Sequence, residues 1–200
     1  MSITEAISPR ERRSHIFARH PDGWYVEPTW CSRRLIEEEQ FAPLIWDPFC
    51  GGGNVLEGAL ANGYTAYGSD IRDRGAATTG AQFRVGDFFA MEPPVEAPFS
   101  IVGNPPFNLM RPAAERAIML APKVALLWRL ARLVAAHWLQ GLPLVRIRML
   151  TPRPSMPTGT HIEAGAYVGG DSHEYAWLIF ERGYVGAPEL GWLFRDGGTS

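Results

Sequence analysis

The sequence is poor in cysteine, in lysine and in long apolar runs, and each shortage excludes a class of protein. Its 200 residues include two cysteines and a single lysine, Lys123. Two cysteines do not build a disulfide framework, so Cys31 and Cys50 are expected to be free thiols in a reducing compartment. No apolar run approaches the roughly 18 residues that cross a bilayer. The polar first residues also lack the apolar segment of a secretory signal, so a cytoplasmic protein without a membrane segment is expected.

Neither positive nor negative charge is in large excess. The formal net charge is −2, and 46% of the residues are hydrophobic, which is typical of a globular domain and unlike the overall basic balance of many nucleic-acid-binding domains. Arginines gather in the first 34 residues and again at 146–153. Both a solvated surface and phosphate contacts are consistent with these groups. The histidines and acids at 161–173 lack tight ligand spacing, so no metal site is predicted.

From about residue 42, short apolar runs alternate with longer amphipathic segments, which is the pattern of βαβ units. Strands are expected at 43–47, 64–69, 83–85, 99–103, 124–128, 144–150 and 175–180, and helices at 55–61, 111–120 and 130–140. Because such crossovers are right-handed and cover a sheet from both sides, the pattern predicts a Rossmann-like α/β fold. The expected sheet has seven mostly parallel strands with helices on both faces.

The same pattern divides the chain. Residues 1–22 are polar and aperiodic and are expected to form an N-terminal arm, whereas 23–185 carry the alternating pattern of one domain. Within that domain, 151–172 is rich in proline and glycine and predicts a long loop on the substrate side. The last residues, 186–200, are expected to be a C-terminal tail.

Singular residues follow the predicted strands, where ligands bind in open α/β sheets. The first strand runs into Asp47-Pro48-Phe49-Cys50-Gly51-Gly52-Gly53, and Asp70 ends the second, 19 residues after Gly51. That spacing suits a carboxylate that binds ribose hydroxyls. The acid at Asp47 would repel a pyrophosphate, and the GxGxxG spacing is absent, so a cationic cofactor is favoured over a dinucleotide. Asp87 either accepts from an adenine amino group or is a turn residue.

The fourth strand ends in Asn104-Pro105-Pro106-Phe107, where the prolines cannot continue a central strand. An exocyclic amine is a poor nucleophile because its lone pair is delocalised into the ring. Two acceptors, the Asn104 side-chain oxygen and the Pro105 carbonyl, would hold its N–H groups and free the lone pair. Phe107 offers a flat face for a base. Asn-Pro also occurs in ordinary turns, but its place after a glycine loop and an acid favours a catalytic loop.

The order of these motifs resembles the class I S-adenosylmethionine-dependent methyltransferases. More narrowly, it is similar to the N6-adenine DNA methyltransferases of the NPPF type, including small phage and prophage enzymes, over about residues 24–182. The resemblance implies the class I methyltransferase fold and S-adenosylmethionine as the cofactor. It also implies DNA as the partner, with the target adenine flipped out.

The resemblance also implies roles for individual residues. The catalytic residues would be Asn104, Pro105, Pro106 and Phe107. The stretch Trp24-Tyr25-Val26-Glu27-Pro28-Thr29 before the first strand is expected to touch the cofactor, with a looser match to the family. The cofactor-binding residues would be Tyr25, Pro28, Asp47, Pro48, Phe49, Cys50, Gly51, Gly53, Asp70, Ile71, Asp87, Phe88 and Asn104. Phe107 and Arg153 are expected to contact the substrate, and no metal is implied.

The chain departs from larger relatives because no segment remains for a separate target-recognition domain. Low sequence specificity, a homodimer or a separate specificity subunit are all consistent with this. Similar loops also serve RNA adenine methyltransferases and protein glutamine methyltransferases, although the glutamine enzymes usually carry a different glycine loop. A non-catalytic cofactor-binding subunit is a third hypothesis, which the intact Asn104, Asp70 and Asp87 argue against.

Overall fold

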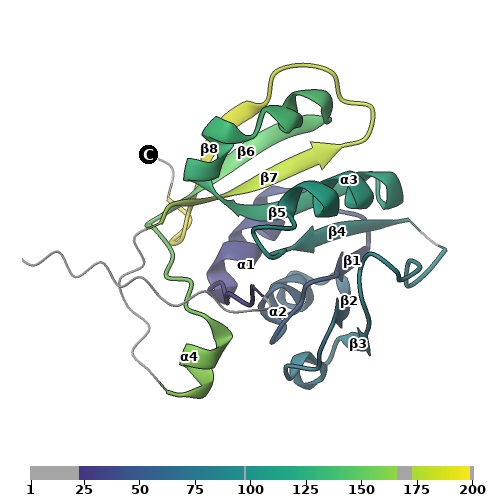
Figure 1. Ribbon diagram of the computed structural model, residues 1–200. Helices are drawn as coiled ribbons and strands as arrows, with labels where there is room; N and C mark the ends of the chain where they lie inside the picture. Colours follow the sequence, from purple (N-terminus) through teal and green to yellow (C-terminus); the bar gives the residue numbers. More distant parts are fainter. Residues whose placement is uncertain (1–22, 97, 166–172, 199–200) are drawn as a thin grey trace, which may run out of the picture.

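The computed structural model describes residues 23–96, 98–165 and 173–198, so the expected N-terminal arm at 1–22 lies outside the described residues. Eight strands form one sheet in the order β3-β2-β1-β4-β5-β7-β6-β8 (Figure 1). The strands are β1 (Leu44–Asp47), β2 (Thr65–Asp70), β3 (Gln82–Val85), β4 (Phe99–Gly103), β5 (Lys123–Arg129), β6 (Leu144–Thr151), β7 (Tyr175–Glu181) and β8 (Glu189–Phe194). The seven strands expected from the sequence are all present.

The first five strands run parallel, and β1 lies between β2 and β4. Strand β7 is antiparallel and is inserted between β5 and β6. Starting from β1, the chain first adds β2 and β3 on one side of that strand and then adds β4 and β5 on the other side. In such sheets the ligand lies beyond the carboxyl ends of the strands at this switch point.

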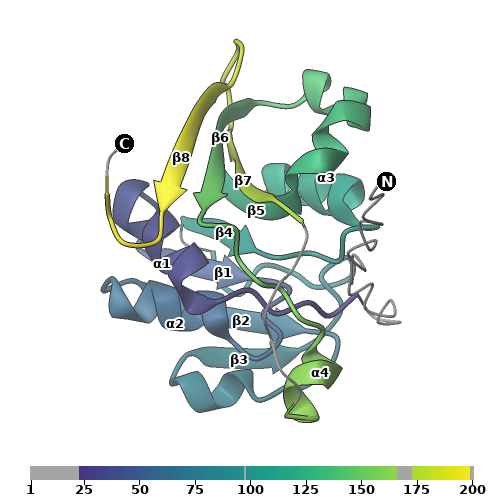
Figure 2. The ribbon, with the colours of Figure 1, turned by 90° about the vertical axis from the view of Figure 1, so that its left-hand side faces the viewer.

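Alternate residues of the central strands pack into two hydrophobic clusters, because successive side chains of a strand point to opposite faces. Ile45 and Val102 join one cluster with α1 (Thr29–Glu38) and α2 (Asn54–Ala61). Trp46 and Ile101 join the other with α3 (Met110–Leu120). Figure 2 shows α1 and α2 side by side. No helix within 23–96, 98–165 or 173–198 is long and apolar enough to cross a membrane.

The C-terminal segment corrects one expectation. The range 186–200 was expected to be a tail, but it contains β8, which pairs in parallel with β6 and makes the sheet eight-stranded. Only Leu193 of this strand is buried. An exposed edge strand lacks the buried alternation from which a strand is recognised, so its pairing could not be read from the sequence.

The helical regions also differ from the expected pattern. The segment 130–140 was expected to be one α-helix but forms the 3₁₀ helices η2 (Leu130–Ala135) and η3 (His137–Gly141), because the backbone turns away at Ala136, with ψ 51°. That break lets Trp138 contact Trp128, with ring centroids 5.8 Å apart. Helix α1, the 3₁₀ helix η1 (Ala76–Thr79) and the short α4 (Gly159–Glu163) were not predicted.

The segment before α1 crosses the carboxyl edge of the sheet and pairs with the chain that follows β6. Val26 N donates to Pro157 O at 2.9 Å, and Gly159 N donates to Trp24 O at 3.1 Å. The described part of the expected long loop, 151–165, is thus tied to the N-terminal segment by backbone hydrogen bonds.

Candidate active site

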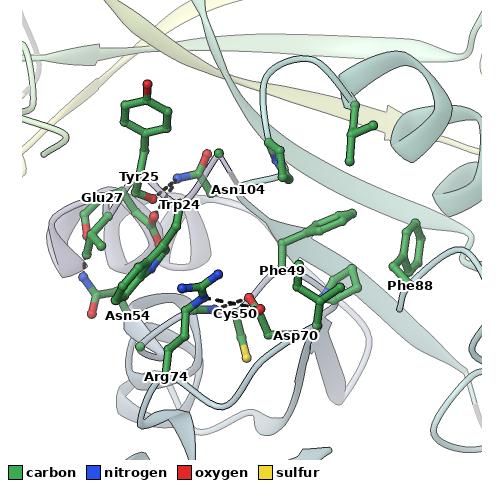
Figure 3. Close-up of a pocket in the computed structure, with 18 of the residues that line it drawn as sticks. Trp24, Tyr25, Glu27, Phe49, Cys50, Asn54, Asp70, Arg74, Phe88 and Asn104 are labelled. Atoms are coloured by element: carbon green, nitrogen blue, oxygen red, sulfur yellow. Dashed lines mark hydrogen bonds and ion pairs between the residues drawn. The ribbon is translucent and has the colours of Figure 1, made fainter. Parts of the chain in front are cut away.

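A cavity of about 310 Å³ opens at the carboxyl ends of β1, β2 and β4 (Figure 3). Its wall is built from five stretches of the sequence: the segment before α1, the glycine loop after β1, the end of β2, the residues after β3, and the loop after β4. The lining residues are Gly23, Trp24, Tyr25, Val26, Glu27, Pro48, Phe49, Cys50, Gly51, Gly52, Asn54, Asp70, Ile71, Arg74, Asp87, Phe88, Phe89, Asn104, Pro106, Asn108 and Leu109.

The glycine loop brings backbone close to this cavity. Gly51 and Gly53 have φ of 49° and 100°, a conformation that other residues rarely adopt. A Cβ on Gly53 would lie 2.5 Å from Thr79 Cγ2, and one on Gly51 would lie 2.9 Å from Trp24 Nε1. Both positions therefore require glycine for two reasons, backbone conformation and space.

Asp70 fixes the loop from the end of β2. Its Oδ2 accepts from Gly51 N at 3.0 Å, and its Oδ1 accepts from Arg72 N at 3.1 Å. Arg74 Nε lies 3.5 Å from Oδ1, so the carboxylate also has a cation beside it. Each carboxylate oxygen has two lone pairs. Because Oδ1 already faces Arg72 N and Arg74 Nε, the second lone pair of Oδ2 is the acceptor site that remains for a ligand hydroxyl.

Trp24 forms a wall of the cavity. The Arg74 guanidinium lies 4.2 Å from the centre of its ring. On the other side, a Cβ on Gly159 would come within 2.2 Å of ring atoms of Trp24. The glycine at the start of α4 is thus what allows the N-terminal segment to close this side of the cavity.

Asn104 stands at the edge of the cavity with its amide orientation fixed. Its Nδ2 donates to Tyr25 O at 3.1 Å and to Glu27 Oε2 at 2.8 Å. A primary amide has two N–H groups, and both are used in these bonds. The side-chain oxygen is therefore the atom of Asn104 that is left to accept a hydrogen bond from a ligand.

The acids near Asn104 are deeply buried. Glu27 is 7% exposed and Asp47 is 1% exposed. Burial raises the pKa of Glu27 to about 7, although the hydrogen bond from Asn104 acts in the opposite direction. Burial, together with the nearby Glu27, raises the pKa of Asp47 well above its usual range. A cation in the cavity would stabilise the charged form of both carboxylates.

Cys50 lines the same cavity without the properties of a nucleophile. Burial and the neighbouring Asp47 and Asp70 carboxylates raise the pKa of its thiol. Since the thiolate is the reactive form, this cysteine is inert.

An aromatic group lies on the other side of Asn104. Phe107 stacks on Tyr25 with ring centroids 5.1 Å apart and an interplanar angle of 24°, and the Tyr175 ring is 6.1 Å away. Figure 3 shows the Tyr25 ring pointing away from Phe49, Cys50 and Asp70. Asn104 therefore lies between the cavity and this aromatic group.

Comparison with known proteins places the architecture. No family model matches the chain, and a search of the curated proteins finds no significant match. A solved structure described as an RNA methyltransferase from Pyrococcus horikoshii superposes with a TM-score of 0.51 at 15% identity, covering 76% of this chain and 80% of that one. A dimethyladenosine transferase from Plasmodium falciparum gives 0.51 at 10% identity, with 76% and 60% covered. An O-methyltransferase structure from Agrobacterium tumefaciens gives 0.50 at 14% identity, with 84% and 85% covered.

The fold is that of the methyltransferases. At identities this low, the structural likeness establishes the fold and leaves the substrate open. Within this Rossmann-like methyltransferase fold, the structure brings many of the predicted residues to the cavity. These are Tyr25, Pro48, Phe49, Cys50, Gly51, Asp70, Ile71, Asp87, Phe88, Asn104 and Pro106.

Other predicted residues do not line the cavity. Pro28 caps the start of α1, and Asp47 lies beneath the glycine loop, where its Oδ1 accepts from Phe49 N at 3.0 Å. Gly53 packs on η1, as its close approach to Thr79 shows. In the catalytic loop, Pro105 is buried and Phe107 belongs to the aromatic group. The exposed Arg153 lies 3.4 Å from Glu174 in an ion pair.

Several residues of the wall, among them Asn54 and Arg74, were not predicted as cofactor contacts, whereas Trp24 and Glu27 belong to the stretch 24–29 that the resemblance implied at the cofactor. Glu27 had a visible signal, because it is an acid in the otherwise apolar stretch from Trp24 to Pro28. Asn54 is the first residue of α2, whose N-cap is Gly53, and its Nδ2 donates to Glu27 O. Among the described residues, no three His, Cys, Asp or Glu side chains gather as metal ligands.

Proposed function

We propose that this protein transfers a methyl group from S-adenosylmethionine to the exocyclic N6 amino group of adenine in DNA. The observation that carries the proposal is the fixed amide of Asn104. Because both of its N–H groups are bonded within the protein, its side-chain oxygen is the acceptor presented beside the cavity. An acceptor there can hold an amino group, whereas a freely turning amide could equally present a donor.

The cavity suits the proposed cofactor in its chemistry. When bound, S-adenosylmethionine supplies an electrophilic methyl group on a cationic sulfonium. Glu27 and Asp70 line the cavity and Asp47 lies beneath it, so the carboxylates there favour a cation. Asp70 retains a lone pair on Oδ2 for a ribose hydroxyl. Phe49 and Phe88, whose ring centroids are 5.1 Å apart, offer apolar surface beside Asp87 for a flat base.

The catalytic loop contacts the amino group that receives the methyl group. The Asn104 oxygen and the Pro105 carbonyl accept from the two N–H groups and draw the nitrogen toward tetrahedral geometry, which frees its lone pair for in-line displacement. The loop is positioned before the substrate arrives, because Glu27 and the Tyr25 carbonyl hold Asn104. Phe107 provides stacking surface. Since Tyr25 covers one face of that ring, an incoming base stacks on the opposite face or displaces Tyr25.

In this proposal residues 23–194 form the methyltransferase domain, and a second subunit or a homodimer contributes the sequence specificity. RNA adenine shares the same amine and the same loop chemistry. A protein glutamine amide and a cofactor-binding subunit without activity are the other two hypotheses.

Nucleoside mass spectrometry tests the proposal. DNA and RNA are analysed separately from cells that lack adenine methylation and express the chain or its Asn104→Ala form. N6-methyladenine in DNA with the unchanged chain alone is the expected result. Methylation of RNA instead would make RNA the substrate and leave the proposed mechanism unchanged. No methylation of either, together with no cofactor binding by calorimetry, would overturn the proposal.

A further inference from the structure

Arg129, at the carboxyl end of β5, lies against the catalytic loop. Its guanidinium carbon is 4.5 Å from the centroid of the Phe107 ring and 5.5 Å from that of Tyr25. The two rings are 5.1 Å apart, so the three distances form a nearly equilateral triangle. The guanidinium therefore lies over both rings of the stacked pair.

The donors of Arg129 lack acceptors. Its Nε is buried and has no hydrogen-bond partner among the described residues. Arg146 and Arg148 of β6 differ, because both pair with Glu39, and Arg153 after β6 pairs with Glu174. Contact with ring faces stabilises the positive charge but satisfies none of the N–H groups, which lie in the plane of the guanidinium. A half-buried cation in this state is suited to an anion from outside the chain.

Its position indicates which anion. Phe107 is in the loop that, in the proposed function, holds the base, and the Arg129 fork lies directly beside it. A nucleotide whose base reaches Phe107 carries its phosphates one sugar away. The rigid arginine fork matches phosphate oxygens in charge and geometry.

We propose that Arg129 binds a backbone phosphate next to the target nucleotide, so that the substrate is a polynucleotide rather than a nucleoside or a protein amide. This inference rests on the proposed function, because that function supplies the base at Phe107. Tyr25 and Phe107 hold the guanidinium in place before the phosphate arrives.

Salt dependence of binding measures the contact. The probe is single-stranded DNA of mixed but adenine-rich sequence, labelled with a fluorophore. It is titrated with the protein in the presence of S-adenosylhomocysteine, and the titration is repeated at several salt concentrations. Each phosphate contact contributes about 0.7 to the slope of log Kd against log salt on a single strand. Arg129→Gln is expected to lower the slope by about that amount, and Arg129→Lys to keep it. Arg84→Gln, at an exposed position on the far strand β3, removes the same charge and is expected to leave the slope unchanged.

Kinetics separate phosphate binding from support of the loop. Arg129→Gln is expected to raise KM for the nucleic acid and to leave kcat and the Kd of S-adenosylmethionine within about threefold. A fall in kcat with unchanged KM and salt slope would overturn the inference, because Arg129 would then act by holding Phe107. An equal loss of slope in Arg84→Gln would also overturn it, since net charge alone would explain the binding.

The two proposals fail in different ways. Methyl transfer by the unchanged chain, with a salt slope that Arg129→Gln does not alter, would remove the phosphate contact and keep the proposed function. A slope that depends on Arg129 in a chain that transfers no methyl group would keep the contact and remove the proposed function. If Arg129→Gln does not fold, binding is measured with Arg129→Lys instead, which retains the positive charge.

Discussion

Asn104 and Glu27 are joined by a hydrogen bond of 2.8 Å from the amide nitrogen of one to the carboxyl oxygen of the other. The two residues are 77 positions apart in the chain. Glu27 comes from the segment before α1, and Asn104 from the loop after β4. The bond therefore ties the wall of the cavity to the loop after β4. It gives the N-terminal segment a role in orienting the group that is proposed to hold the substrate amine.

Removing the acceptor at position 27 is expected to slow methyl transfer. In Glu27→Leu one N–H of Asn104 loses its partner, and the amide can turn its nitrogen toward the substrate. Losing a hydrogen bond to a charged group costs about 1.5–3 kcal/mol, which corresponds to roughly a 10- to 100-fold lower kcat. Single-turnover kinetics with saturating cofactor measure this change.

The matched variant is Glu27→Gln, whose side-chain oxygen can still accept from Asn104. It is expected to keep kcat within severalfold of the unchanged chain. If the leucine and glutamine variants lost activity equally, the carboxylate charge rather than the orientation of Asn104 would matter. The assignment of Glu27 as a positioning residue would then be wrong.

The same carboxyl predicts a pH dependence of stability. The pKa of Glu27 is raised from 4.5 to about 7 in the folded protein, so between these values the folded state binds a proton that the unfolded state has released. The free energy of unfolding from this group is therefore greatest below pH 4.5 and is lost as the pH rises through 7. The shift corresponds to about 3 kcal/mol.

Urea unfolding at pH 5 and pH 8 tests this effect in the cofactor-free protein. Glu27→Gln does not titrate, so its stability is expected to fall less between the two pH values, by up to about 3 kcal/mol. Asp47 has a raised pKa for the same reason and keeps part of the slope in both proteins. Parallel curves for the two proteins would show that Glu27 is ionised throughout this range.

The fold was largely predictable because its central strands are short, apolar and followed by turn residues. Strand β4 was expected at 99–103 and is found there, since the prolines at 105 and 106 end it. Strand β8 could not be predicted, because its pairing with β6 depends on contacts remote in sequence and only Leu193 is buried. The 130–140 segment has helix-forming residues, and only tertiary packing around Trp138 explains its break.

Residue patterns predicted the site where chemistry follows a strand end, whereas the wall that the distant segment before α1 supplies was expected from the family resemblance alone. Asp70, Asp87 and Asn104 follow strands and line the cavity as expected. Glu27 and Trp24 reach it only because the N-terminal segment pairs with residues 157–159. That pairing has no local signature, since it joins two irregular stretches more than a hundred residues apart.

Asp70 is expected to support both the loop and the cofactor. Asp70→Ala removes the acceptor for the backbone N–H groups of Gly51 and Arg72, and it removes the proposed acceptor for ribose. Each bond lost to a charged group costs about 1.5–3 kcal/mol, so the Kd of S-adenosylmethionine should rise at least about 10-fold in calorimetry. The control is Asp73→Ala, which removes an exposed carboxylate whose Oδ1 accepts from Gly75 N at 2.9 Å. An unchanged Kd in Asp70→Ala would remove Asp70 from the cofactor site.

Gly159 tests the link between α4 and the cavity wall. In Gly159→Ala the new Cβ would lie within 2.3 Å of three ring atoms of Trp24, so the ring must move away from its place over Gly51 and Arg74. Overpacking of this kind costs about 1–3 kcal/mol, and cofactor affinity is expected to fall roughly 5- to 100-fold. Gly141→Ala is the matched control, because no atom lies within 4 Å of its Cβ position.

A double variant identifies the cause of that loss. If the clash with Trp24 is responsible, Gly159→Ala should add nothing to Trp24→Ala, because the smaller side chain removes the contact. The two substitutions would then be strongly non-additive in their effect on the Kd of S-adenosylmethionine. Additive losses would mean that the methyl group at position 159 disturbs α4 itself, and that the wall formed by Trp24 does not depend on this glycine.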